Sequence, residues 1–234
     1  MISGIIASMP LDGGAVDTLA TTPGGFPTAI VVDTNRAYWV EQPGDSNPGP
    51  LRVLSIGLGG GSPVELARSS PAQFLYASPI KDYGMGLDDT GIYWTNTVDG
   101  TVEVIPSDGG SSSIIGRSDA GLASGVAVAS GQLFFVGGNG LERVEIASGR
   151  QSTVAPSAAS HETVSADRDH VYFVVPGSDS TNQVWRAPMD GGTPELLLAD
   201  MPNIWSVAND EASVFLNVEA CGSAPGEILQ LRKP

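Results

Sequence analysis

Short apolar runs separated by polar turns recur along the whole chain, and no segment keeps a sustained helical period. In the clearest repeat an Asp stands five residues before an aromatic pair, at Asp33 with Tyr38-Trp39, at Asp88 with Tyr93-Trp94 and at Asp167 with Tyr172-Phe173. Weaker copies keep this spacing at Ala129 with Phe134-Phe135 and at Asp210 with Phe215-Leu216. Each copy predicts two strands joined by a tight turn, the second strand rich in β-branched and aromatic residues.

A second repeat alternates with the first and ends in Asp-Gly-Gly, at 10–14, 106–110 and 188–192, with weaker copies at 57–61 and 146–150. Asp-Gly between apolar runs indicates a hairpin, because Gly adopts a positive φ without steric penalty. An Asp that opens a turn accepts hydrogen bonds from the backbone that follows it. We therefore interpret the aspartates of the first repeat as turn-forming residues.

The two repeats together define a unit of four strands, A to D. The aromatic pair lies on strand B, and the Asp-Gly-Gly turn joins C to D. The chain divides into strands C and D of a first unit (1–22), four complete units (23–70, 71–119, 120–157 and 158–200) and strands A to C of a last unit (201–234). Four-stranded units at this period predict an all-β fold, a single β-propeller domain of antiparallel blades.

One blade resembles a known family. Residues 91–96, Gly-Ile-Tyr-Trp-Thr-Asn, followed by 100–110, resemble a blade of the YWTD propellers of lipoprotein receptors and, more strongly, their bacterial YWTD/NHL-like relatives. The fourth position of the signature is occupied by Glu41, Asn96, Gly137, Val175 and Val218, so its aspartate is absent from every copy. The resemblance covers nearly the whole chain and implies six blades. It implies no particular function, because unrelated functions share such a fold.

The two ends of the chain raise the question of how the ring closes. Propellers protect their edges by pairing strands from both termini within one blade. Here the last strand, 227–231, aligns with the first, 4–10, and two copies of strand C cannot occupy the same place. We expect six blade positions with the first and last incomplete, and self-association through an open blade edge. A five-bladed ring with the last strand C left over is the alternative.

Charge and cysteine content limit the partners. Eleven basic and 26 acidic side chains give a formal net charge of −15, which repels phosphate backbones and anionic lipid headgroups, so no nucleic acid partner is expected. Cys221 is the only cysteine, which excludes an intrachain disulfide. The sequence has no apolar run long enough to span a bilayer, and its first residues lack the features of a signal peptide. We nevertheless expect an extracellular or periplasmic location.

Loop lengths indicate which face carries function. The spacing from the turn Asp to the aromatic pair is constant, whereas the loops between strands B and C and those between D and the next A vary from blade to blade. Both kinds of loop lie on the same face of a propeller. Binding surfaces commonly form from variable loops on a rigid scaffold. We therefore expect a non-catalytic scaffold that binds a protein or a small polar ligand through this B–C/D–A loop face.

The residues at the start of each strand A are expected to surround the mouth of the central channel. Their side chains differ in chemistry and form our candidate ligand-binding set: Thr28, Asp82, Tyr83, Ser124, His161, Glu162 and Trp205. Tyr, Trp, His and carboxylate side chains around one opening suit a polar or aromatic ligand. The second histidine, His170, is expected in an A–B turn on the opposite face, exposed to solvent.

The alternative function is a metal-dependent hydrolase of the gluconolactonase-like kind, whose propellers place carboxylate and amide ligands around a metal at the channel mouth. Glu162, assisted by Asp82 or His161, is the candidate residue here. Ca²⁺ prefers several oxygen ligands, and Glu162 is the only carboxylate in the inner ring of candidates, so no metal site and no cofactor are assigned. The sequence contains no nucleophile elbow, phosphate loop or zinc-spaced His/Cys set, and no catalytic residue is assigned.

Overall fold

The computed structural model describes residues 3–23, 25–43, 49–69, 84–97, 99–119, 121, 123–156, 163–177, 181–202, 204–218 and 226–233. Within these ranges every regular element is a β-strand, and the strands number 21. The all-β prediction is therefore confirmed. None of the described residues forms a helix that could cross a membrane.

The strands form six antiparallel sheets, numbered here as blades 1 to 6. Blade 1 contains β1 (Ser3–Ser8) and β2 (Asp17–Pro23). Blade 2 contains β3 (Gly25–Val32), β4 (Arg36–Pro43), β5 (Arg52–Gly57) and β6 (Val64–Arg68). Blade 3 contains β7 (Met85–Leu87), β8 (Ile92–Asn96), β9 (Thr101–Ile105) and β10 (Ser113–Arg117).

The other half of the chain continues the series. Blade 4 contains β11 (Ala123–Ala129), β12 (Gln132–Gly137), β13 (Gly140–Glu145) and β14 (Arg150–Ala155). Blade 5 contains β15 (Val164–Ala166), β16 (His170–Pro176), β17 (Asn182–Pro188) and β18 (Glu195–Met201). Blade 6 contains β19 (Ile204–Asn209), β20 (Ser213–Val218) and β21 (Glu227–Arg232). Blades 2 to 5 thus have strands A to D, blade 1 has C and D, and blade 6 has A to C.

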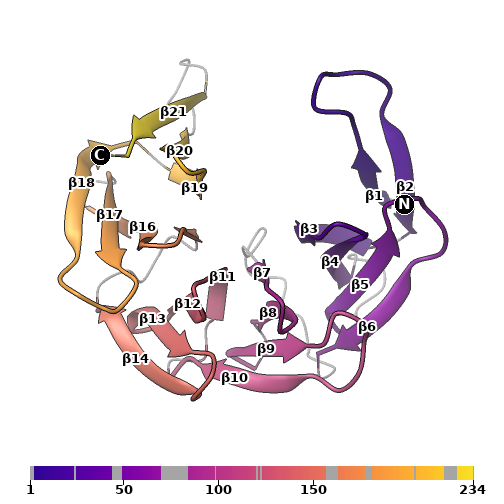
Figure 1. Ribbon diagram of the computed structural model, residues 1–234, viewed down its shortest axis with the longest axis horizontal. Helices are drawn as coiled ribbons and strands as arrows, with labels where there is room; N and C mark the ends of the chain where they lie inside the picture. Colours follow the sequence, from indigo (N-terminus) through magenta and orange to yellow (C-terminus); the bar gives the residue numbers. More distant parts are fainter. Residues whose placement is uncertain are drawn as a thin grey trace.

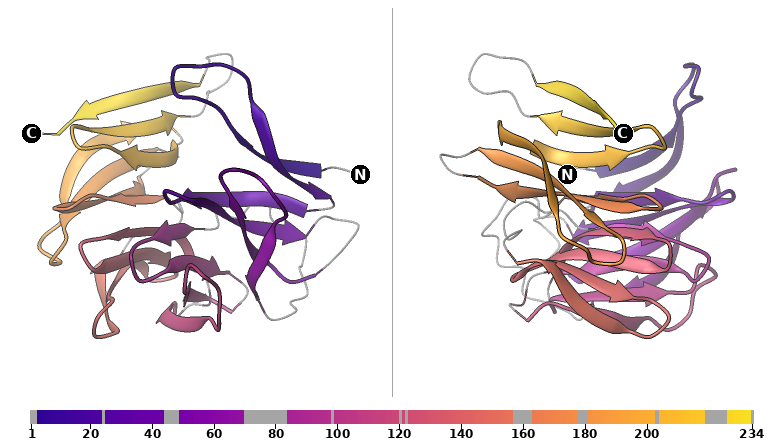
Figure 2. Two further views of the ribbon diagram at one scale, coloured as in Figure 1. Left: turned by 45° about the vertical axis from the view of Figure 1, so that its right-hand side comes forward. Right: turned by 60° about the vertical axis from the view of Figure 1, so that its left-hand side comes forward.

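The blades follow one another around a common centre, and the arc is open between blade 1 and blade 6 (Figure 1). Strands A, such as β3, β7, β11 and β19, lie nearest the centre, and strands D, such as β6, β10, β14 and β18, lie on the outside. Figure 2 shows the sheets stacked side by side around the arc. The first and last sheets are separate in the described residues, and no strand pairing joins them. This distribution of strands confirms the predicted propeller with incomplete first and last blades.

The aromatic pair explains how neighbouring blades pack. Its two side chains point to opposite faces of strand B, as successive residues of a strand do. Tyr38 of blade 2 therefore packs toward blade 3, where it meets Ile92 and Trp94 in one buried cluster. Each following blade repeats this contact, so that five apolar clusters lie between consecutive blades from 1 to 6. Full burial of one such large apolar side chain contributes about 1.5–3 kcal/mol.

The C–D turns have the predicted hairpin geometry. In three copies the amide of the first Gly donates to the carbonyl of the Pro three residues earlier, at 2.9–3.0 Å for Gly13, Gly109 and Gly191. These glycines have φ values of 86°, 91° and 86°. Side chains with a Cβ rarely adopt such values, which explains the glycine at this position of the repeat.

Candidate functional site

The turn aspartates form the most regular polar feature of the molecule. Oδ1 of Asp33 accepts hydrogen bonds from the backbone amides of Asn35 and Arg36, both at 2.7 Å. Its second oxygen, Oδ2, accepts the hydroxyl of Tyr38 at 2.8 Å. One carboxylate therefore holds the A–B turn and anchors the buried aromatic residue of strand B.

The other blades repeat this arrangement to different extents. Asp167 accepts the amides of Asp169 and His170 at 2.8 Å and the Tyr172 hydroxyl at 2.9 Å. Asp88 and Tyr93 make the same contact at 3.2 Å. In blade 6 Asp210 keeps only the two backbone amides, because Phe215 has no hydroxyl. The aspartates are therefore turn-forming residues, as predicted from the sequence.

These contacts shift the acidity of both partners. The amide of Asn35 is the main cause that lowers the pKa of Asp33. Burial, together with the adjacent Asp33 carboxylate, raises the pKa of Tyr38 to about 12. Burial also raises the pKa of Tyr93 to about 12 and is the main cause that raises the pKa of Tyr172. Each hydroxyl thus stays protonated and donates to its carboxylate throughout the neutral range.

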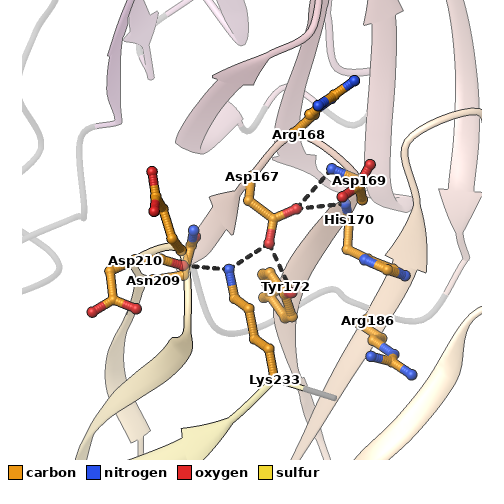
Figure 3. A pocket seen from close by; sticks show the side chains of 10 residues that line it. Asp167, Arg168, Asp169, His170, Tyr172, Arg186, Asn209, Asp210 and Lys233 are labelled. Carbon is orange, nitrogen blue, oxygen red and sulfur yellow. Dashed lines mark hydrogen bonds and ion pairs between the residues drawn. The ribbon is translucent and has the colours of Figure 1, made fainter.

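A pocket of about 540 Å³ lies between the A–B turns of blades 5 and 6 (Figure 3). Its lining is strongly charged and consists of Asp167, Arg168, Asp169, His170, Tyr172, Arg186, Asn209, Asp210, Glu211 and Lys233. Lys233, directly after β21, donates from Nζ to Oδ2 of Asp167 and to the backbone carbonyl of Asp210, both at 2.5 Å. The same ammonium lies 5.1 Å from the centre of the Tyr172 ring. Lys233 therefore links the end of blade 6 to the A–B turn of blade 5.

One ion pair lies within this pocket, from Lys233 to Asp167. Burial acts to raise the pKa of Asp167, but the hydrogen bond from Lys233 and those from two backbone amides outweigh it and hold the pKa at about 2. Arg186 is paired with Glu195 at 2.8 Å. We interpret the contact of Lys233 with Asp167 as a clamp between blades 5 and 6. His170 lies in an A–B turn as expected, but it is half-buried and lines this pocket instead of being fully solvated.

The predicted channel-mouth set is described only in part. Asp82, Tyr83, His161 and Glu162 lie outside the described residues. Thr28 is half-buried, and its hydroxyl donates to the carbonyl of Val40 at 3.4 Å. Ser124 is buried, whereas Trp205 at the start of β19 is 50% exposed. Among the described members, Trp205 offers a ligand the largest accessible surface.

Two of the signature positions carry buried polar side chains with partners of their own. Glu41 is paired with Arg52 of β5. Asn96 donates from its amide to Asp99 and to Glu103, at 2.9 Å in each case. Glu103 also accepts the hydroxyl of Ser112 at 2.7 Å. Across the part of the chain that the structure describes, no three His, Cys, Asp or Glu side chains are grouped so that they could hold a metal ion.

Sequence reasoning missed the Lys233 clamp, although a signal was present. Lys233 is one of only two lysines in the chain, and it follows directly after the last apolar strand. What the sequence did not show is that the adjacent A–B turn comes close enough for its aspartate to accept this ammonium.

No protein-family model matches the chain, and no curated protein matches it either. Solved structures share its fold. A chain from a crystal structure of a nidogen/laminin complex has a TM-score of 0.64 and 16% identity, over 92% of this chain and 82% of that chain. Virginiamycin B lyase from Staphylococcus aureus has a TM-score of 0.65 and 14% identity, over 96% and 76%. PQQ-bound aldose sugar dehydrogenase from Streptomyces coelicolor has a TM-score of 0.60 and 14% identity, over 97% and 87%.

These similarities support the β-propeller fold and no particular function. They include a protein complex and two enzymes, so the fold itself does not separate binding from catalysis.

Proposed function

We propose that the chain is a non-catalytic binding scaffold whose B–C/D–A loop face recognises a protein or a small polar ligand. The observation that carries this proposal is the half exposure of Trp205 at the inner end of that face, in a molecule that buries Trp39 and Trp94 completely. Tryptophan supplies much of the binding energy in known interfaces, because it combines a large apolar surface with one polar N–H group. An extracellular or periplasmic location belongs to the same proposal.

The position of Trp205 adds to its exposure. It is the second residue of β19, the innermost strand of blade 6, close to the loop that connects blades 5 and 6. The next residue, Ser206, is exposed as well, whereas Ile204 is buried. The pairing register of β19 with β20 shifts between Ile204 and Ser206, so the exposed indole lies at a β-bulge beside a buried residue. Such an aromatic side chain loses little conformational freedom when a partner covers it.

Selection of peptides from a display library tests this proposal. Peptides are selected on the intact chain and then measured against Trp205→Ala and against Leu196→Ala. Leu196 is a matched control because it is also exposed, at 42%, but lies at the C–D end of β18. We expect selected peptides to lose affinity for Trp205→Ala by about tenfold or more and to bind Leu196→Ala unchanged. Selected peptides that bind both variants equally would place the binding surface elsewhere.

The metal-dependent hydrolase remains the competing account, and one titration separates the two. Calorimetry of the wild-type chain and of Glu162→Ala with Ca²⁺, Mg²⁺ and Zn²⁺ should show no site-specific binding if the scaffold proposal holds. Micromolar binding that disappears in Glu162→Ala would favour the hydrolase, because a hard cation needs that carboxylate as a ligand.

A further inference from the structure

The pocket between the A–B turns of blades 5 and 6 lies on the face opposite the B–C/D–A loops. Its volume of about 540 Å³ falls within the range of about 300–1,000 Å³ that is usual for small-molecule sites. The two A–B turns supply most of its lining, and Arg186 of β17 and Lys233 after β21 come from the C strands of the two blades. None of these residues takes part in the proposed function, so a ligand here would occupy a second site.

Burial divides the charged lining of this pocket into a floor and a rim. On the floor the side chains of Arg186 and Lys233 are only 18% and 13% exposed, and His170 is half-buried. The rim consists of exposed residues of the two A–B turns, one basic and three acidic: Arg168, Asp169, Asp210 and Glu211. The floor therefore carries the basic side chains, whereas acidic side chains prevail at the rim.

One basic side chain of the floor is already used within the protein. Lys233 donates to Asp167, so this ammonium and this carboxylate offset one another. Asp167 also accepts two backbone amides and the hydroxyl of Tyr172, which leaves it little capacity for a ligand. The floor groups that remain for a ligand are Arg186 and His170, and both are basic.

The guanidinium of Arg186 has one nitrogen available. Its Nε and Nη2 donate to the same oxygen of Glu195, at 2.9 and 2.8 Å, whereas Nη1 forms no hydrogen bond with the described residues. In blade 4 the counterpart by strand pairing is Arg143, whose Nη1 donates to the carbonyl of Met189 in the next blade at 3.1 Å. Blade 5 thus leaves free the nitrogen that blade 4 uses between blades.

His170 and Arg186 lie on the same side of the pocket floor. His170 and Tyr172 are two residues apart on β16, and Tyr172 is paired with Arg186, so the three side chains share one face of blade 5. Figure 3 shows the His170 ring and the Arg186 guanidinium to the right of Tyr172, with the Lys233 ammonium to its left. Imidazole and guanidinium N–H groups both donate to carboxylates. This side of the floor therefore suits the carboxylate of a ligand.

The acidic rim determines the other end of the ligand. Three carboxylates against one guanidinium repel a ligand that is only anionic and attract one whose outer end is cationic. We propose that the pocket binds a zwitterionic peptide of two or three residues, with its carboxylate on Arg186 and His170 and its ammonium at Asp169 and Glu211. Two or three extended residues span roughly 7–10 Å, which matches the width of about 10 Å of a sphere with the pocket's volume.

Calorimetric titration of the full chain with trialanine tests the proposal without any variant. The measurement uses about 0.15 M salt, where the screening length is about 8 Å, so that long-range attraction to the acidic chain contributes little. We expect saturable binding of trialanine, at least about tenfold weaker binding of its C-terminal amide, and at least about threefold weaker binding of its N-acetyl form. No saturable binding of trialanine up to about 10 mM would overturn the proposal, and so would equal binding of trialanine and its amide.

Two variants then locate the site. Arg186→Gln should weaken trialanine binding by at least about tenfold, whereas Arg143→Gln, which removes the counterpart arginine outside the pocket, should change it less than about threefold. Thermal melts check that both variants are folded. Equal weakening by both variants would overturn the assignment to this pocket.

Trp205→Ala separates this site from the loop face. It should leave trialanine binding unchanged, because Trp205 is not part of the pocket. Trialanine binding lost in Trp205→Ala but kept in Arg186→Gln would overturn the pocket site and leave the loop-face function standing.

Discussion

At the scale of single residues, the account depends on an Asp that performs two tasks. In blades 2, 3 and 5 it holds the A–B turn through backbone amides and also accepts the hydroxyl of a tyrosine five residues later. Blade 4 has lost both partners, with Ala129 and Phe134, and blade 6 has lost the hydroxyl alone. No blade retains the tyrosine without the Asp, as expected when a buried hydroxyl without an acceptor costs free energy.

A double-mutant cycle at Asp33 and Tyr38 measures this contact. Tyr38→Phe should lower the free energy of unfolding by about 1 kcal/mol, the usual contribution of one such hydrogen bond. Asp33→Ala should cost more, because it also releases the amides of Asn35 and Arg36. The coupling free energy between the two changes, obtained from urea unfolding of all four proteins, should be about 1 kcal/mol. A coupling near zero would show that the hydroxyl and the carboxylate do not stabilise one another.

The stability of the protein at acidic pH should depend on the protonation of Asp167. Its pKa is held at about 2 in the folded chain, below the ordinary value of 3.8. A carboxyl group whose pKa is lowered by folding stabilises the protein above its unfolded-state pKa, and the stabilisation is lost as the pH falls through the folded-state value. Thermal melts should therefore show Asp167→Asn less stable than wild type at neutral pH, with the difference shrinking as the pH falls from about 4 to about 2.

The control for this experiment is Asp108→Asn, which removes one carboxylate from an exposed C–D turn. Its stability difference from wild type should be small, within about 0.5 kcal/mol at neutral pH, as for most surface substitutions. If Asp167→Asn and Asp108→Asn have the same pH dependence, then the Lys233 clamp contributes nothing to stability.

At the scale of elements, equivalent strands differ in what covers them. Val184 on β17 is fully buried between blades 5 and 6, whereas Ile228, its counterpart on β21, is mostly exposed. Val184→Ala should cost about 2 kcal/mol of unfolding free energy, since it removes buried methyl groups and leaves a cavity. Ile228→Ala should cost less than about 0.5 kcal/mol when measured on dilute protein. Equal costs would mean that blade 6 is covered on both faces.

The difference between these two positions explains what the sequence could and could not predict. Strand order, turn geometry and the role of Asp33 follow from local patterns, because turn chemistry and alternation act over a few residues. Ile228 has the same local pattern as Val184, so nothing near it in the sequence reveals that its neighbour is missing. The same limit applies to Lys233, whose partner Asp167 is 66 residues away. Among the predicted channel-mouth residues, the pattern placed Trp205 and Ser124 alike, although the structure exposes one and buries the other.

At the scale of the whole molecule, the central claim is a propeller arc in which β21 pairs with β20 alone within the described residues. Hydrogen exchange followed by NMR tests this claim most directly, because it compares the amide of Ile228 with those of Val53, Val102, Leu141 and Val184. These four lie on strands that pair with a fourth strand. In dilute solution the Ile228 amide should exchange at least about 100-fold faster than all four, because its N–H points away from β20 and no described strand pairs with it. An Ile228 amide as well protected as its counterparts in dilute monomer would contradict the account, because it would mean that the edge is already covered within one chain.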